Sequence, residues 1–253
     1  MGRSVSFIKI ITSGVSVNSD VSLQKRIIGG NDCHVTDRPY HVRLSSRKGT
    51  SSTLCGGTLI HAEWVLTAAH CWESEPGWTN VVISKVHPRT ATQETQVIRD
   101  DPVIYTDHGR QHDIMLLKLR RPVTGVPLAL LPKCKNRLKN PAASASAHLG
   151  QVIRAPAEPE PVQLRCVGPE TLLCQRMNSF MSGCSWSQLQ HTPMCFYGNI
   201  DLSEGDSGSG VEFDDRIYGV IAECTGEYAC QMPAKIMDVC EYKAWIKETT
   251  GIK

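Results

Sequence analysis

Three residues far apart in the chain carry the side chains that hydrolysis by an activated serine requires. His70 stands in LTAAHC, Asp113 opens DIMLLKL, and Ser207 lies in EGDSGSG. This chemistry needs an alcohol that attacks a carbonyl carbon, an imidazole that takes the alcohol's proton, and a carboxylate that fixes the tautomer of the imidazole and stabilises its charged form. Only a fold can bring the three stretches together, so the elements that hold them decide the question.

Each stretch taken alone also has a simple structural interpretation. The glycine, aspartate and serine around Ser207 are residues that tight turns select. LTAAHC is typical of a core strand that ends in a structural histidine, and DIMLLKL is a buried strand whatever the function. The catalytic interpretation therefore rests on the three motifs occurring in one chain.

The elements that must position these residues are predicted to be mainly strands. Short β-branched and apolar runs at 81–86, 113–119 and 216–223 are separated by glycine, proline and polar clusters, which is typical of an all-β protein. The end of the chain differs, because apolar residues recur at helical spacing over 239–250 and a glycine follows. The Ala/Pro/Ser-rich segment 139–162 is predicted to be a long surface loop or a connection between two halves.

Composition and charge narrow the class of protein. A chain of 253 residues with 41% hydrophobic residues can bury a large core, as one domain or as two halves of roughly 100 residues each. A net charge of +2, without a basic run, argues against nucleic acid or an anionic membrane as a partner. No apolar run reaches about 18 residues, so no membrane-spanning segment is predicted.

Together with RIIGG at 26–30 and CGGTLI at 55–60, the three motifs resemble those of the trypsin-like, chymotrypsin-fold serine proteases of peptidase family S1. The resemblance covers roughly residues 26–250, and the order His, Asp, Ser matches that of the family. It implies two antiparallel six-stranded β-barrels, with the active site in the cleft between them, and a C-terminal α-helix. The first barrel would span about 27–130, the second about 131–238 and the helix about 239–250.

The resemblance assigns further roles close to Ser207. The backbone N–H groups of Gly205 and Ser207 would donate to the oxyanion of the tetrahedral intermediate. Asp201, six residues before Ser207, stands where trypsin has the carboxylate at the base of its primary specificity pocket. A carboxylate there would select Arg or Lys by a charge-assisted hydrogen bond and penalise an apolar side chain.

RIIGG implies activation by proteolysis. A cut after Arg26 would remove residues 1–26 as a leader and activation propeptide and make Ile27 the new N-terminus. In the family this α-ammonium pairs with the aspartate beside the nucleophile, here Asp206. Because a lone buried carboxylate is costly, the pocket and oxyanion hole would become ordered only after the cut.

Several positions depart from the family pattern and keep two functional classes open. Ala222, Glu223 and Cys224 replace the Ser-Trp-Gly run that usually lines the cleft, and Ala234 replaces a glycine of the pocket wall. The first class is an active endopeptidase with basic primary preference, retuned by these changes. The second is a protease-like homologue with weak or no activity that acts as a binding or regulatory protein. Retention of the whole triad favours the first.

Eleven cysteines indicate a disulfide framework formed in an oxidising compartment, and hence a secreted protein. The N-terminus is an atypical leader, since its short apolar stretch is broken by Lys9. An odd cysteine count leaves at least one thiol unpaired or paired between chains. Matching to the family suggests the pairs Cys33 with Cys166, Cys55 with Cys71 and Cys134 with Cys240, and Cys195 with Cys184 or Cys174.

No cofactor or metal is expected. His108 and His112 stand beside two aspartates, but their i, i+4 spacing aligns metal ligands only on a helix. The segment 83–97 has one acidic residue, which does not support a calcium loop. The expected partners of a monomeric enzyme are protein or peptide substrates, an activating protease and protein inhibitors of proteases.

Overall fold

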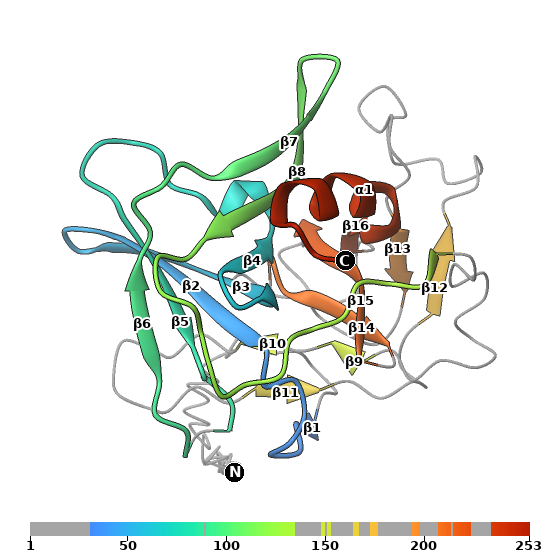
Figure 1. Ribbon diagram of the computed structural model, residues 1–253, viewed down its shortest axis with the longest axis horizontal. Coiled ribbons are helices and arrows are strands. Elements are labelled where there is room, and N and C mark those ends of the chain that lie inside the picture. Colours follow the sequence, from blue (N-terminus) through green and yellow to red (C-terminus); the bar gives the residue numbers. More distant parts are fainter. Residues whose placement is uncertain are drawn as a thin grey trace, which may run out of the picture.

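The computed structural model describes residues 31–88, 90–134, 148–149, 151–152, 164–166, 173–176, 194–197, 207–213, 215–223 and 234–253. Within these ranges the chain forms strands and a single α-helix at its C-terminal end (Figure 1). Every pairing between named strands is antiparallel.

The largest sheet has seven strands in the order β6-β5-β2-β3-β4-β8-β7. This sheet carries both His70 and Asp113. His70 lies in η1, the short turn after β4, and Asp113 lies within β8, the strand paired with β4. The elements are β2 His41–Lys48, β3 Ser51–His61, β4 Trp64–Thr67, η1 Ala69–Cys71, β5 Thr79–Ser84, β6 Glu94–Val97, β7 Val103–Asp107 and β8 Arg110–Lys118.

A six-stranded sheet, in the order β12-β13-β16-β15-β14-β9, carries the turn of Ser207 at the start of β14. A small three-stranded sheet, β1-β11-β10, lies beside it. The elements are β1 Asn31–Asp32, β9 His148–Leu149, β10 Gln151–Val152, β11 Leu164–Cys166, β12 Leu173–Arg176, β13 Met194–Tyr197, β14 Gly210–Phe213, β15 Arg216–Glu223 and β16 Ala234–Asp238.

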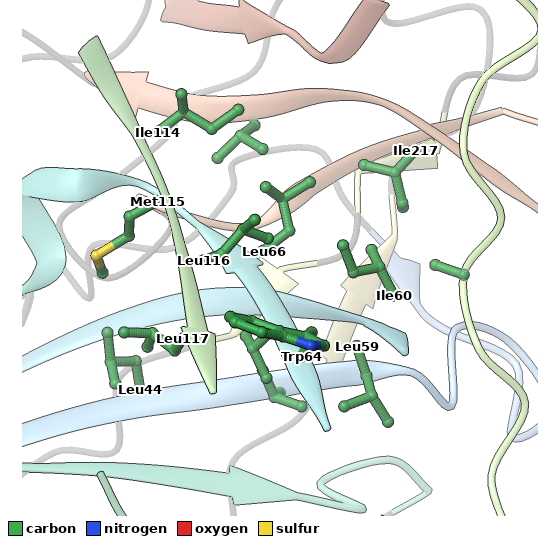
Figure 2. Close-up of a cluster of buried hydrophobic side chains, with 14 of the residues drawn as sticks. Leu44, Leu59, Ile60, Trp64, Leu66, Ile114, Met115, Leu116, Leu117 and Ile217 are labelled. Atoms are coloured by element: carbon green, nitrogen blue, oxygen red, sulfur yellow. The ribbon is translucent and has the colours of Figure 1, made fainter. Parts of the chain in front are cut away.

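The hydrophobic core joins the two large sheets. Strand β8 buries four consecutive apolar side chains, 114–117, which indicates that both of its faces are covered. These side chains pack with residues of β2, β3 and β4, and Ile217 of β15 lies in the same cluster (Figure 2). Removal of this apolar surface from water is the main favourable contribution to folding. It also fixes β15, and with it β14, against the seven-stranded sheet.

Helix α1, Val239–Thr250, closes the chain beside the β7–β8 hairpin (Figure 1). The side chain of Asp238 caps its N-terminus by accepting a hydrogen bond from the Cys240 N–H, and Gly251 ends it with φ 74°. Its Tyr242 ring packs edge-on against Tyr105 of β7. The helix therefore supports the strands that lead into Asp113.

The all-β fold with a C-terminal helix is confirmed. The helix covers 239–250 and β15 covers 216–223, as predicted. One strand count differs, since the larger sheet has seven strands where six were expected, and the described strands form open sheets. One edge strand of this sheet, β7, pairs with β8 as a hairpin. Among the residues that the structure describes, none of the helices has the length and apolar character of a membrane span.

Candidate active site

His70 is held by the short helical turn that follows β4. The turn, η1, directly follows the buried strand β4, and the Cys55–Cys71 disulfide ties it to β3. The histidine side chain is 44% exposed, so its ring can be reached from solvent. The sequence prediction of this disulfide is confirmed.

Asp113 accepts two hydrogen bonds from His70. Its Oδ1 accepts from the His70 backbone N–H at 2.8 Å, and its Oδ2 lies 2.8 Å from Nδ1 of the ring. Because a carboxylate can only accept, Nδ1 of His70 carries a hydrogen. The pair therefore presents an imidazole that a carboxylate orients, which is the arrangement that a hydrolytic triad uses to move a proton at Nε2.

The turn of Ser207 is fixed by backbone hydrogen bonds to both large sheets. The Ser207 carbonyl accepts from the N–H of Gly56 in β3 at 2.8 Å, and the Gly208 N–H donates to the Ile221 carbonyl in β15 at 2.7 Å. Gly208 has φ 80°, a conformation that other residues adopt at a cost. A Cβ on Gly208 would collide with Thr67 Oγ1 and the Gly56 carbonyl. The predicted nucleophile thus sits in a tightly enclosed turn whose conformation requires a glycine at 208.

The same contacts bring Ser207 to the region of His70. The Gly208 position abuts Thr67 and Ala68, the residues that lead into η1, and a Cβ there would stand 3.3 Å from the Ala68 nitrogen. The Nε2 atom of His70 lies 3.8 Å from Cys71 Sγ, on the side of η1 that faces β3 through the Cys55–Cys71 disulfide.

The carboxylates and histidines considered as metal ligands have other partners. Glu94, the acidic residue of segment 83–97, forms an ion pair with Lys85 at 2.5 Å. His108 is exposed at the tip of the β7–β8 hairpin and pairs with Asp107 at 2.7 Å, whereas His112 is buried and lies 3.0 Å from the Tyr242 hydroxyl. His108 and His112 therefore lie in different surroundings.

One group of potential metal ligands gathers in the described residues. Ligand atoms of Cys55, His70 and Cys71 lie within 4.8 Å of one another. The two cysteines are joined in a disulfide, so neither sulfur is a thiolate donor.

Two further disulfide predictions can be compared with the structure. Cys134 is bonded to Cys240, as predicted. Cys33 is disulfide-bonded, and β1 pairs with β11 so that Asn31 lies opposite Cys166. The pairing of Cys33 with Cys166 and the partner of Cys195 stay predictions.

The remaining predicted site residues are placed only in part. Ala222 is buried in β15 with 5% exposure, so its side chain presents little surface to a substrate. The backbone places Glu223 at the end of β15 and Ala234 at the start of β16. Arg26, Ile27, Asp201, Gly205, Asp206 and Cys224 lie outside the described residues.

Two residues that organise the site were not predicted. The Gly56 N–H holds the Ser207 carbonyl, and Thr67 Oγ1 donates to the Gly56 carbonyl at 2.7 Å. Both stand inside motifs that the sequence does show, CGGTLI and LTAAHC. Their contacts connect residues from distant parts of the chain, and spacing alone does not reveal such contacts.

Comparison with known proteins defines the class. The family model described as Trypsin matches residues 27–246, and the chain therefore belongs to the trypsin family. It is 28% identical to "Serine protease 1" of Canis lupus familiaris, over 96% of this chain and 98% of that protein. It is 29% identical to "Trypsin" of Xenopus laevis, over 88% and 90% of the two chains.

A solved structure shows the same fold. The structure titled "Structure of GrC" matches 88% of this chain and 99% of its own, with a TM-score of 0.68 and 24% identity. The chain is thus a trypsin-like protein in fold and family, and this membership supports a peptidase.

Proposed function

We propose that this chain is a secreted serine endopeptidase, made as a zymogen and activated by cleavage after Arg26. The observation that carries the proposal is the pair of hydrogen bonds from His70 to both oxygens of Asp113. The backbone contacts that bring the Ser207 turn beside the same element support it. The disulfides between Cys55 and Cys71 and between Cys134 and Cys240 support folding in an oxidising compartment.

In the proposed reaction, His70 Nε2 takes the proton of the Ser207 hydroxyl as its oxygen attacks the scissile carbonyl carbon. Backbone N–H groups of Gly205 and Ser207 donate to the oxyanion. The imidazolium then gives its proton to the leaving amine, and the acyl chain stays esterified to Ser207. Water, activated by the same imidazole, hydrolyses that ester. Asp113 stabilises the imidazolium through the Nδ1–H bond in both halves of the reaction.

Two parts of the proposal concern specificity and control. Asp201 at the base of the pocket would select substrates with Arg or Lys before the scissile bond. After the cut, the ammonium of Ile27 would pair with Asp206. An activating protease, protein or peptide substrates and protein inhibitors would be the partners of the mature enzyme.

The test uses the full chain, purified and cut after Arg26, with Ile27 verified as the new N-terminus by mass spectrometry. Hydrolysis is measured on peptides that differ only in Arg, Lys, Phe or Ala before the scissile bond. We expect turnover after Arg and Lys, none with Ser207→Ala, and none with Arg26→Gln exposed to the same activating protease. Full activity of the uncut Arg26→Gln protein would contradict zymogen activation.

The same assay tests the second functional class. If the cut, folded protein turns over no peptide above the Ser207→Ala control, the endopeptidase proposal is wrong. The altered wall positions Ala222, Glu223, Cys224 and Ala234 would then define a protease-like binding protein. The altered wall would in that case be tested for peptide binding rather than for hydrolysis.

A further inference from the structure

A buried ion pair lies behind the Ser207 turn. Arg38 Nε stands 2.8 Å from Glu212 Oε2, and the two side chains are only 6% and 9% exposed. At this distance the groups form an ion pair, although the N–H does not point along the line to that oxygen. Arg38 precedes β2 and Glu212 belongs to β14, so the pair joins the two large sheets.

Burial makes this pair poorly suited to stabilising the fold alone. Both charges lose their hydration, and apolar residues of similar volume often stabilise such a site equally well. Removing only one partner, by contrast, leaves an uncompensated buried charge and is strongly destabilising. What a buried pair does supply is a constraint on position, because the attraction between the two charges is much stronger in the interior than in water and resists their separation.

Arg38 is held in a backbone conformation that arginine rarely adopts. Its φ is 47°, in the left-handed region. Its carbonyl accepts from the His41 N–H at 3.0 Å, and the Tyr40 carbonyl accepts from the Leu59 N–H at 2.8 Å. These bonds fix the arginine to β2 and β3. Strained residues of this kind persist where the surrounding structure requires them, often near functional sites.

Tyr40 completes the buried group. It is 5% exposed, and burial, followed by the charge of Glu212, raises the pKa of its hydroxyl. The hydroxyl therefore stays protonated beside the carboxylate. A neutral tyrosine leaves the arginine as the charge that balances Glu212 within this group.

Glu212 occupies the part of β14 where the position of the Ser207 turn is set. It follows Ser207 by five residues, and the pairing of β14 with β15 shifts register between Val211 and Glu212. A bulge loosens the regular ladder that would otherwise fix the strand. The ion pair meets the strand at that point and ties it to the sheet that carries His70 and Asp113.

We propose that Arg38 and Glu212 are positioning residues that hold the Ser207 turn in register with the His70–Asp113 pair. The proposal rests on the proposed endopeptidase function for its kinetic consequence. The structural consequence, protection of the hydrogen bond from the Gly208 N–H to the Ile221 carbonyl, is independent of the endopeptidase function.

Three variants separate position from stability. Glu212→Gln removes the negative charge that faces the buried Arg38 guanidinium, and we expect it to lower both the melting temperature and kcat. The double variant Arg38→Met, Glu212→Gln removes both charges, and we expect its melting temperature to return to within about 3 °C of the parent. Its kcat should remain about 10- to 100-fold lower with KM little changed, since misplacement of catalytic groups acts on the chemical step. Arg38→Lys keeps the charge without the planar fork, and we expect it to fold with a smaller loss of kcat.

The matched control is the exposed pair Lys48 and Glu75, at 3.3 Å and 44% and 73% exposed. Lys48→Met with Glu75→Gln should leave kcat unchanged, because exposed pairs contribute little. In all proteins, amide hydrogen exchange at Gly208 gives a second measurement that needs no turnover. We expect faster exchange in the Arg38 and Glu212 variants and not in the control.

Parental kcat and parental exchange in the folded double variant would overturn the proposal. If the double variant does not fold, parental kcat and a parental exchange rate at Gly208 in Arg38→Lys would overturn the proposal. If the activated parent itself turns over no peptide, the endopeptidase function fails separately. The exchange at Gly208 then decides on positioning alone.

Discussion

The two hydrogen bonds from His70 to Asp113 give the carboxylate a role that an amide could not fill. Both oxygens accept, one from the backbone N–H and one from Nδ1. We expect Asp113→Asn to lower kcat about 10⁴-fold, because an amide that donates to Nδ1 stabilises the wrong tautomer. The matched control is Asp107→Asn, which also removes a carboxylate paired with a histidine, at the exposed hairpin tip. Equal losses in the two variants would contradict the assignment.

His41 carries a second prediction at this scale, on stability at low pH. Burial, and then the charges of Arg38, His87 and Arg43, lower the pKa of His41 from 6.5 to about 3. Below pH 6.5 the unfolded chain binds a proton that the folded one does not. Above pH 6.5, His41 therefore contributes its full share to the free energy of unfolding. Between pH 6.5 and about pH 3, that share falls by about 1.4 kcal/mol for each pH unit.

This dependence can be measured by urea unfolding at several pH values, in a Ser207→Ala background that prevents self-digestion. His41→Gln should flatten the slope of unfolding free energy against pH by about one proton. His108→Gln, whose parent side chain is 93% exposed, serves as the control and should keep the parental slope. A parental slope in His41→Gln would show that the ring is not a neutral buried group.

At the scale of elements, the turn between Ser207 and β14 has little room for a larger side chain. Gly208 and Gly109 have similar dihedrals, with φ 80° and 77°, but a Cβ collides with the protein only at Gly208. We expect Gly109→Ala to cost about 1 kcal/mol of unfolding free energy, from backbone strain alone. Gly208→Ala adds overpacking and should cost about 2 to 4 kcal/mol and abolish labelling of Ser207 by a fluorophosphonate. Thermal unfolding and labelling, compared between the two variants, check this.

The elements also show what sequence can predict. The helix 239–250 was predicted with its bounds because its apolar spacing and its terminal glycine are local signals. The strand 216–223 was likewise predicted from a local signal, its run of β-branched and apolar residues. Strand β7, 103–107, at the edge of the larger sheet, is one of the strands that the sequence analysis did not name, and it is defined by pairing with β8. Its turn, His108–Gly109, is the local signal that could have indicated a hairpin.

At the scale of the whole molecule, the candidate site was predicted through its reactive residues and not through their supports. His70 and Asp113 were expected to meet because their motifs resemble those of the trypsin-like proteases, and the structure joins them. The contact of Arg38 with Glu212 joins residues from distant segments, and charged residues are mostly solvated. No local pattern marks such a pair, so only the folded chain reveals it.

The Cys134–Cys240 disulfide has a consequence for handling the protein. It closes a loop with a sequence separation of 106 residues, from Cys134 to Cys240 in the first turn of α1. A single cut anywhere within this loop leaves both pieces covalently attached. We therefore expect a sample nicked there to run as one band in denaturing gels without reductant and as two bands after reduction. Two bands without reductant would contradict the disulfide between Cys134 and Cys240. A preparation that appears intact by size without reductant can therefore already consist of two polypeptide chains.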